Sequence, residues 1–221
     1  MDLTPFILSL KLALTTTLIL LFVGLLLVYL IHFLSFRLRP FFKAIVSLPL
    51  VLPPSVLGYY LLVTLQPEST LGKIANSLLG IQLIFSFQGL VIASIIYSLP
   101  FMVNPILSAI EGLPRSLEEA SYTLGKSGWQ TYFKVLIPNI KPSIVIAATM
   151  AFAHTIGEFG VILMIGGNIP NETRVASVAI YNEVETLNYS QANMYALILL
   201  IFSFVVLALV YYFQEKRVQP I

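Results

Sequence analysis

The chain has 221 residues, of which 58% are hydrophobic and only 10% charged, with a formal net charge of +2. Soluble domains carry about 25% charged residues, so the composition indicates an integral membrane protein in a lipid bilayer and gives no reason to expect a nucleic-acid partner. The absence of cysteine excludes a disulfide framework, a thiolate metal site and a cysteine nucleophile. His32 and His154 lack the spacing of metal ligands, so no metal, cofactor or catalytic centre is expected.

The first apolar run follows the start MDLTPFILSL. This start lacks the basic leader of a cleaved signal peptide, and the run after it is too long for one. We therefore expect the run to remain in the protein as a membrane span.

Five apolar runs are long enough to cross the bilayer, which takes about 20 residues in a helix. Runs of this length fit helices and not barrel strands, so the predicted fold class is all-α, a polytopic membrane helix bundle. Because prolines interrupt helical hydrogen bonding, Pro53, Pro54 and Pro100 predict kinks. The predicted spans are residues 12–34, 44–65, 83–107, 143–165 and 195–213, in one transmembrane domain over residues 8–213.

Lys and Arg predict which ends of the spans face the cytoplasm. Three of the twelve, Lys11, Lys73 and Arg174, fall on one side. Because Lys and Arg are enriched in cytoplasmic loops, the other side is predicted to be cytoplasmic, with the N-terminus outside and the C-terminus inside. The nine residues on that side are Arg37, Arg39, Lys43, Arg115, Lys126, Lys134, Lys141, Lys216 and Arg217.

The cytoplasmic loop over residues 112–142 has the pattern of two short helices. Ser116-Leu-Glu-Glu119 predicts a capping box at the start of the first, and Gly125 predicts its left-handed end. Ser127-Gly-Trp-Gln130 predicts a second capping box, and Pro138 the end of the second helix. The apolar positions are Leu117, Ala120 and Leu124 on the first helix, and Trp129, Tyr132, Phe133, Leu136 and Ile137 on the second.

These apolar faces need a partner, either lipid headgroups or a cytoplasmic protein. The loop resembles the EAA loop of ABC-importer permeases, in which Glu-Ala-Ala precedes Gly by three residues and Ile-x-Leu-Pro follows after nine. Here Glu119-Ala120-Ser121 precedes Gly125 by three residues, and Val135-Leu136-Ile137-Pro138 follows after nine. Three small or volume-conserving replacements leave the spacing intact, which favours protein docking over lipid.

The resemblance implies that the first helix sits in a groove on a cytoplasmic ABC ATPase subunit. Glu119 would lie near basic residues of that subunit, and Gly125 would allow the sharp turn. Coupling is therefore assigned to Glu119, Ala120, Gly125, Trp129 and Pro138. Closure of two ATPases would push the docked helices together and rock the spans. The alternative for Glu119 is a role confined to the capping box.

Two further stretches, LPLVLPPSVLGYYLLV at residues 48–63 and AHTIGEFG at residues 153–160, extend the resemblance. With NIPNETR at 168–174 they resemble the permease subunits of molybdate importers, with sulfate permeases as close relatives. The resemblance covers nearly the whole chain and implies transport of molybdate, or alternatively of tungstate or sulfate. It also implies an extracytoplasmic molybdate-binding protein as a partner and a prokaryotic cytoplasmic membrane as the location.

Glu158 is the acidic residue that falls well inside a predicted span, with His154 four residues earlier on the same helical face. An intramembrane charge normally faces the bundle interior or water. The two side chains are expected either to pair and pin neighbouring helices or to contact the substrate. A carboxylate repels a dianion, which favours the structural role.

Kinked helices expose backbone amides that can tolerate an anion without fixed cations. On this basis Ser47, Pro53, Pro54 and Ser55 are predicted to form the gate and line the pathway. The alternatives are a packing kink for the prolines and hydrogen bonds to their own helix for the serines.

The sequence has no phosphate-binding loop of the Walker type, so ATP hydrolysis is expected on a separate chain. One docking loop per chain predicts a homodimer that engages two ATPases. Three other classes are alternatives: a proton-coupled transporter using Glu158 and His154, a membrane enzyme, and a non-transporting anchoring subunit. The first leaves the docking loop unexplained, and the second lacks any catalytic constellation.

Overall fold

A computed structural model describes residues 2–218, and all regular secondary structure within that range is helical. Three of the described helices are long and apolar enough to cross a membrane: α1 (Thr4–Phe33), α5 (Phe87–Glu111) and α12 (Tyr189–Val218). Two bent pairs raise the number to five if each counts as one span. The predicted all-α membrane bundle is therefore confirmed, and three of the predicted spans correspond to continuous helices.

The predicted span 44–65 is wrong as a single helix. Residues Arg39–Val51 form α2 and Pro54–Leu65 form α3, and the two are bent by 108°. Pro53 adopts an extended conformation with φ −55° and ψ 139°, and neither it nor Pro54 has an N–H for the helical ladder. Two consecutive prolines therefore break the helix, whereas α5 continues through Pro100 and Pro105.

The predicted span 143–165 is also divided. Helix α9 (Lys141–Gly157) ends where Glu158 turns extended, with φ −67° and ψ 134°, and α10 (Gly160–Gly166) begins after it. Because Glu158 lies at this break, it is not in the middle of a continuous helix as predicted.

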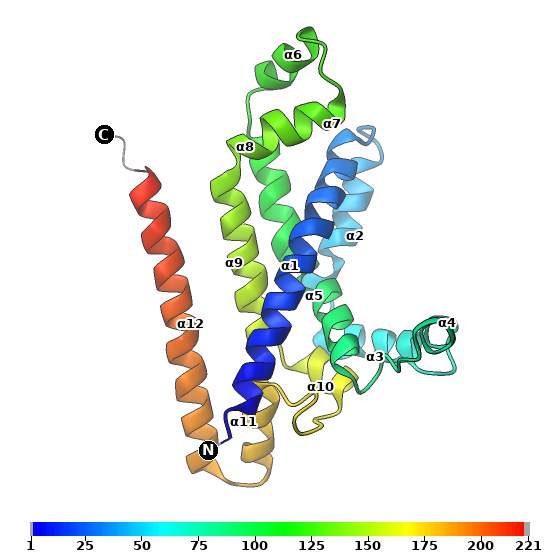
Figure 1. Ribbon diagram of the computed structural model, residues 1–221, viewed down its shortest axis with the longest axis vertical. Coiled ribbons are helices and arrows are strands. Elements are labelled where there is room, and N and C mark those ends of the chain that lie inside the picture. Colours follow the sequence, from blue (N-terminus) through cyan, green and yellow to red (C-terminus); the bar gives the residue numbers. More distant parts are fainter. Residues whose placement is uncertain (1, 219–221) are drawn as a thin grey trace.

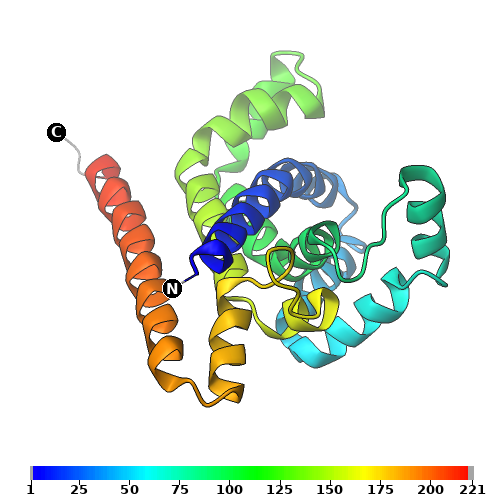
Figure 2. The same cartoon turned by 60° about the horizontal axis from the view of Figure 1, so that its bottom comes forward.

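The core of the bundle is formed by α1, α5 and α9, which lie side by side (Figure 1). Gly24 on α1 allows this close packing, since a Cβ built there would stand 2.7 Å from Cγ of Met102 on α5. Helix α12 stands apart from these helices (Figure 2), and in the single chain only 6% of its apolar window is buried. The functional segments are therefore positioned by α1, α5 and α9.

Short helices lie at both ends of the bundle. Helices α6 (Arg115–Thr123) and α7 (Gly128–Thr131) lie at one end, at the top of Figure 1, and α10 and α11 (Ala176–Glu185) lie toward the other. We call these the α6 end and the α11 end. Helix α4 (Thr70–Leu79) projects sideways after α3. Its N-cap Ser69 accepts a hydrogen bond from the Gly72 amide, a cap that the apolar pattern does not indicate.

Candidate functional site

The first helix of the 112–142 loop is present, but its predicted capping box is wrong. Helix α6 begins at Arg115, its N-cap is Pro114, and no side-chain cap bond is made. The extended conformation of Pro114 starts the helix before Ser116, so Ser116 lies inside the first turn. Glu119 is consequently released from the predicted cap, and its exposed side chain forms no hydrogen bond or ion pair with the described residues.

The turn after α6 follows the prediction. Gly125 has φ +74°, a left-handed conformation that favours glycine, and its N–H donates to the Tyr122 carbonyl at 2.9 Å. Ser127 and Gln130 form the predicted capping box at α7. Gly125-Lys126-Ser127 thus joins two helices and lacks the preceding strand of a nucleotide-binding loop.

The second helix is longer and less regular than predicted. After α7 the chain makes a π-helical turn over Tyr132–Leu136 and continues as α8 (Ile137–Asn139). Pro138 therefore lies inside the helix, and the break comes at Ile140, where the chain bends by 80° into α9. Such π-turns are uncommon and are frequently found at functional sites. This one ends two residues before Pro138, which lacks an N–H for the regular α-helical ladder.

The second helix is built into the bundle. Tyr132 and Leu136 are fully buried, and the Tyr132 hydroxyl donates to the Leu25 carbonyl on α1 at 2.7 Å. The Trp129 ring meets Tyr29 of α1 edge-on at 5.0 Å between centroids. The predicted apolar stripe is therefore the face that attaches the loop to α1.

Helix α6, in contrast, presents its apolar side chains to the surroundings. Ser121 is its buried residue and Leu117 is partly buried, whereas Ala120 is exposed and Leu124, the C-cap, is 77% exposed. Together with Glu119, these side chains form an uncovered surface at the α6 end. This surface is chemically suited to contact a protein that offers an apolar groove and a basic side chain.

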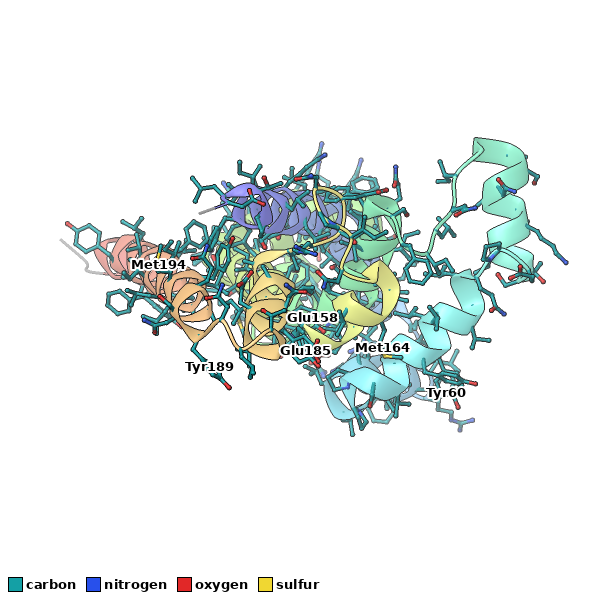
Figure 3. All side chains as sticks on the ribbon, turned by 90° about the horizontal axis from the view of Figure 1, so that it is seen from below. Tyr60, Glu158, Met164, Glu185, Tyr189 and Met194 are labelled. Carbon is teal, nitrogen blue, oxygen red and sulfur yellow. The ribbon has the colours of Figure 1, made fainter. Side chains whose placement is uncertain are left out.

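The two breaks in the helices meet in the folded chain. Gly160, at the start of α10, faces Pro54, at the start of α3: a Cβ built on Gly160 would stand 2.8 Å from Cβ of Pro54. One turn along α3, Gly58 faces Met164 in the same way, with 2.7 Å to its sulfur. Figure 3 shows Met164 against α3, with Glu158 near the centre of the bundle. The two stretches Leu48–Val63 and Ala153–Gly160 therefore form one packed junction, which we call the break junction.

The predicted pairing of His154 with Glu158 is wrong. His154 Nδ1 lies 2.9 Å from the Ser98 hydroxyl, and its ring stacks on Phe101 at 4.0 Å between centroids. The Glu158 carboxylate, one residue before the N-cap Phe159, accepts a hydrogen bond from the Val161 amide at 2.9 Å and so caps the first turn of α10. The i, i+4 relation holds only in a continuous helix, and the helix ends at Gly157.

Replacement of Glu158 by Gln is expected to leave transport close to wild type, because the amide oxygen can still accept from Val161. Replacement by Ala removes the cap and is expected to lower stability by about 1 kcal/mol, as for other N-caps. Thermal unfolding and uptake by both variants would check this. Loss of uptake by the Gln variant would show that the charge itself is required.

The predicted pathway residues lie near this junction but differ in their contacts. Ser47 on α2 accepts a hydrogen bond from Asn104 of α5 at 3.1 Å. Its hydroxyl therefore pairs with another helix and not, as in the alternative, with its own. Pro53, Pro54 and Ser55 are exposed at the bend. Asn104 is a polar partner that the sequence patterns did not predict, although an amide between Pro100 and Pro105 in an apolar run is a usable signal.

Comparison with known proteins gives a consistent result. Residues 21–219 match the family model described as "Binding-protein-dependent transport system inner membrane component". The chain is 45% identical to the molybdenum transport system permease protein ModB of Azotobacter vinelandii, over 95% of this chain and 93% of that protein. It is 35% identical to a probable sulfate transport system permease protein, cysT, of Chlorella vulgaris, over 81% of this chain and 67% of that protein.

Among solved structures, a bacterial alginate ABC transporter in complex with its alginate pentasaccharide-bound periplasmic protein has the same fold. The superposition has a TM-score of 0.79 at 17% identity and covers 98% of this chain and 79% of the other. At this identity the similarity concerns the fold alone.

Proposed function

The chain belongs to the family of binding-protein-dependent transport system inner membrane components, and we propose that its role there is import of molybdate, energised by separate ATPase subunits. The observation that carries this proposal is the 45% identity to a molybdenum permease along nearly the full length of both chains. Members of this family are permease subunits and not enzymes, so this chain forms the membrane part of the importer. Tungstate or sulfate remains the alternative substrate, since the sulfate permease relative is also similar.

In this proposal α6 docks in a groove on a cytoplasmic ATPase subunit. The exposed Ala120 and Leu124 fill the groove, and Glu119 meets a basic side chain. Gly125 provides the turn, while Trp129 and the helix around Pro138 hold the loop on the bundle. The α6 end is then cytoplasmic, as the distribution of Lys and Arg indicates.

The same orientation places the α11 end outside, with the N-terminal start of α1. An extracytoplasmic molybdate-binding protein would deliver the anion to this end. A second copy of the chain would supply the second docking loop for two ATPases. The proposed location is the bacterial cytoplasmic membrane, crossed five times when each bent pair counts as one span.

The pathway in this proposal follows the bend between α2 and α3. Ser47, Asn104 and Ser55 offer hydroxyl and amide groups there, whereas the amides of Val56 and Leu57 at the start of α3 donate to the Pro53 carbonyl. Neutral donors bind a dianion weakly enough to release it, which suits a permease supplied by a separate binding protein. Replacement of Ser47 and Ser55 together by Ala tests this, since unchanged uptake would remove both residues from the pathway.

Uptake competition tests the substrate assignment. Vesicles that carry the full complex with its binding protein and ATPases would be supplied with labelled molybdate and an excess of molybdate, tungstate or sulfate. The expected result is ATP-dependent accumulation that sulfate fails to inhibit. Sulfate competing as well as molybdate would move the assignment to a sulfate permease, and uptake driven by a pH gradient without ATPases would indicate a secondary transporter.

Replacement of Glu119 by Gln tests the docking role separately. The carboxylate has no partner within the described chain, so this variant is expected to fold normally but to retain less ATPase on purification. The loss expected from one charge-assisted contact is about 1.5–3 kcal/mol, or roughly ten- to a hundredfold in affinity. Glu68, an exposed carboxylate beyond α3, provides a control when changed to Gln. Equal ATPase retention in both variants would contradict the docking role of Glu119.

A further inference from the structure

Helix α6 is joined to the bundle by polar contacts more than by apolar packing. Ser121, its buried residue, lies with its hydroxyl 2.9 Å from the hydroxyl of Thr131. The Glu118 carboxylate lies 2.9 Å from His32 Nε2, at the end of α1. A cavity of about 600 Å³ lies between α6 and the ends of α1 and α5 and is lined by several charged side chains. The contact between Glu118 and His32 is therefore a direct polar route from α6 to α1, beside the packing of α6 on α7 and the π-helical turn.

The contact at His32 continues into a series of hydrogen bonds and ion pairs. The His32 carbonyl accepts a hydrogen bond from the Arg39 guanidinium at the start of α2. Arg39 lies 3.9 Å from the Glu111 carboxylate at the end of α5, and Lys43 of α2 lies 2.7 Å from the same group. Glu118, His32, Arg39, Glu111 and Lys43 thus link four helices. We call these five residues the inner polar chain.

Helix α2 contributes Arg39 and Lys43 to the inner polar chain at one end, and its other end leads to the break junction. Its 13 residues span about 20 Å at 1.5 Å per residue. A shift at Arg39 or Lys43 therefore moves the far end of α2 as well, next to the bend at Pro53 and Pro54. The start of α3 is seated on Gly160 there, so such a shift acts directly on the break junction.

We propose that the inner polar chain transmits movement of α6 to α2 and so to the bend at Pro53–Pro54, with His32 and Arg39 as positioning residues. This inference rests on the proposed function, in which the ATPases move α6. Three charged side chains of the inner polar chain are only partly buried: those of Arg39, Lys43 and Glu111 are 31%, 37% and 32% exposed. Ion pairs at this exposure add little to stability. The side chains of His32 and Glu118 are 10% and 28% exposed, so variants there are compared with Glu118→Gln, which keeps a hydrogen-bond acceptor.

The test is the number of ATP molecules hydrolysed per molybdate imported, measured in proteoliposomes with the full complex. His32→Ala and Glu118→Ala are each expected to raise this ratio at least roughly fivefold, the lower end for coupling between sites. The double variant is expected to match the single ones, because both changes break one link. Glu118→Gln keeps an acceptor for His32 Nε2 and is expected to restore most of the coupling, whereas Glu68→Ala is the neutral control.

A second measurement keeps the inference testable if the Ala variants fail to assemble into a complex. Because the chain has no cysteine, His32→Cys with Glu118→Cys can be joined by a short, reducible thiol crosslinker. The linked complex is expected to import molybdate at a low ATP ratio, and reduction of the linker is expected to raise it. An unchanged ratio in every variant, beside active wild type, would overturn the inference. Failure of wild type to import molybdate would instead reject the proposed function.

Discussion

Replacement of Gly160 by Val is expected to abolish most transport while the ATPases stay bound to the 112–142 loop. A Cβ at this position would stand 2.8 Å from Cβ of Pro54, and a proline ring cannot rotate away as a flexible side chain can. Overpacking of this kind costs about 1–3 kcal/mol, which corresponds to roughly a five- to hundredfold loss in the population of the native junction. Uptake in proteoliposomes and ATPase copurification measure the two effects separately.

Gly157 supplies the matched control for this experiment. It lies three residues earlier, at the end of α9, and a Cβ built there has no neighbour within 4 Å. Gly157→Val is therefore expected to retain transport close to wild type. Normal uptake by Gly160→Val would show that tight contact between α3 and α10 is not needed, and the break junction would lose its functional role.

Replacement of Gly125 by Val is expected to detach the ATPases from an otherwise folded permease. Gly125 has φ +74°, and a left-handed backbone costs a residue with a Cβ roughly 1–2 kcal/mol. The chain would escape this strain by changing the turn between α6 and α7, which reorients the exposed face of α6. The measurement is ATPase copurification, together with import by whatever complex remains.

Gly80 controls for the strain itself. It ends α4 with φ +65°, and a Cβ built on it, like one built on Gly125, would meet only open space. Gly80→Val is thus expected to lose similar stability, as judged by thermal unfolding, yet to keep its ATPases. Equal ATPase loss in the two variants would mean that general destabilisation, and not the orientation of α6, caused the effect.

Local features of the 112–142 loop could be predicted because neighbouring residues determine them. The left-handed Gly125 and the box between Ser127 and Gln130 involve residues at most a few positions apart, and both predictions are confirmed. The predicted box at Ser116 is wrong for a local reason as well. Pro114 starts α6 earlier, which leaves Ser116 inside the helix.

The spans show what an apolar run does not specify. Hydropathy located α1, α5 and α12, because a continuous apolar helix is the simplest structure for such a run. The kink predicted at Pro53 and Pro54 is confirmed, but its angle of 108° could not be predicted, because the same composition suits a slightly kinked helix and two separate ones. The bend is stabilised by α10, a partner about 100 residues away in the sequence.

Contacts between distant residues account for the rest of the difference. Sequence patterns offer no means to place Asn104 against Ser47, or Glu118 against His32, because both contacts depend on how helices cross. The mistaken pairing of His154 with Glu158 has the opposite origin. Residues four apart lie on the same face only within a continuous helix, and the helix ends at Gly157, between His154 and Glu158.

Site-directed crosslinking of α6 tests the docking claim most directly. Because the chain has no cysteine, single cysteines at Ala120 and Leu124 would carry the only thiols of this subunit, with Leu187 near the α11 end as control. In the assembled complex, thiol-attached photoreactive crosslinkers at positions 120 and 124 are expected to capture an ATPase subunit, and the control is expected to capture none. Crosslinks from both α6 positions to lipid alone, in a complex that imports molybdate, would contradict the docking of α6 on an ATPase.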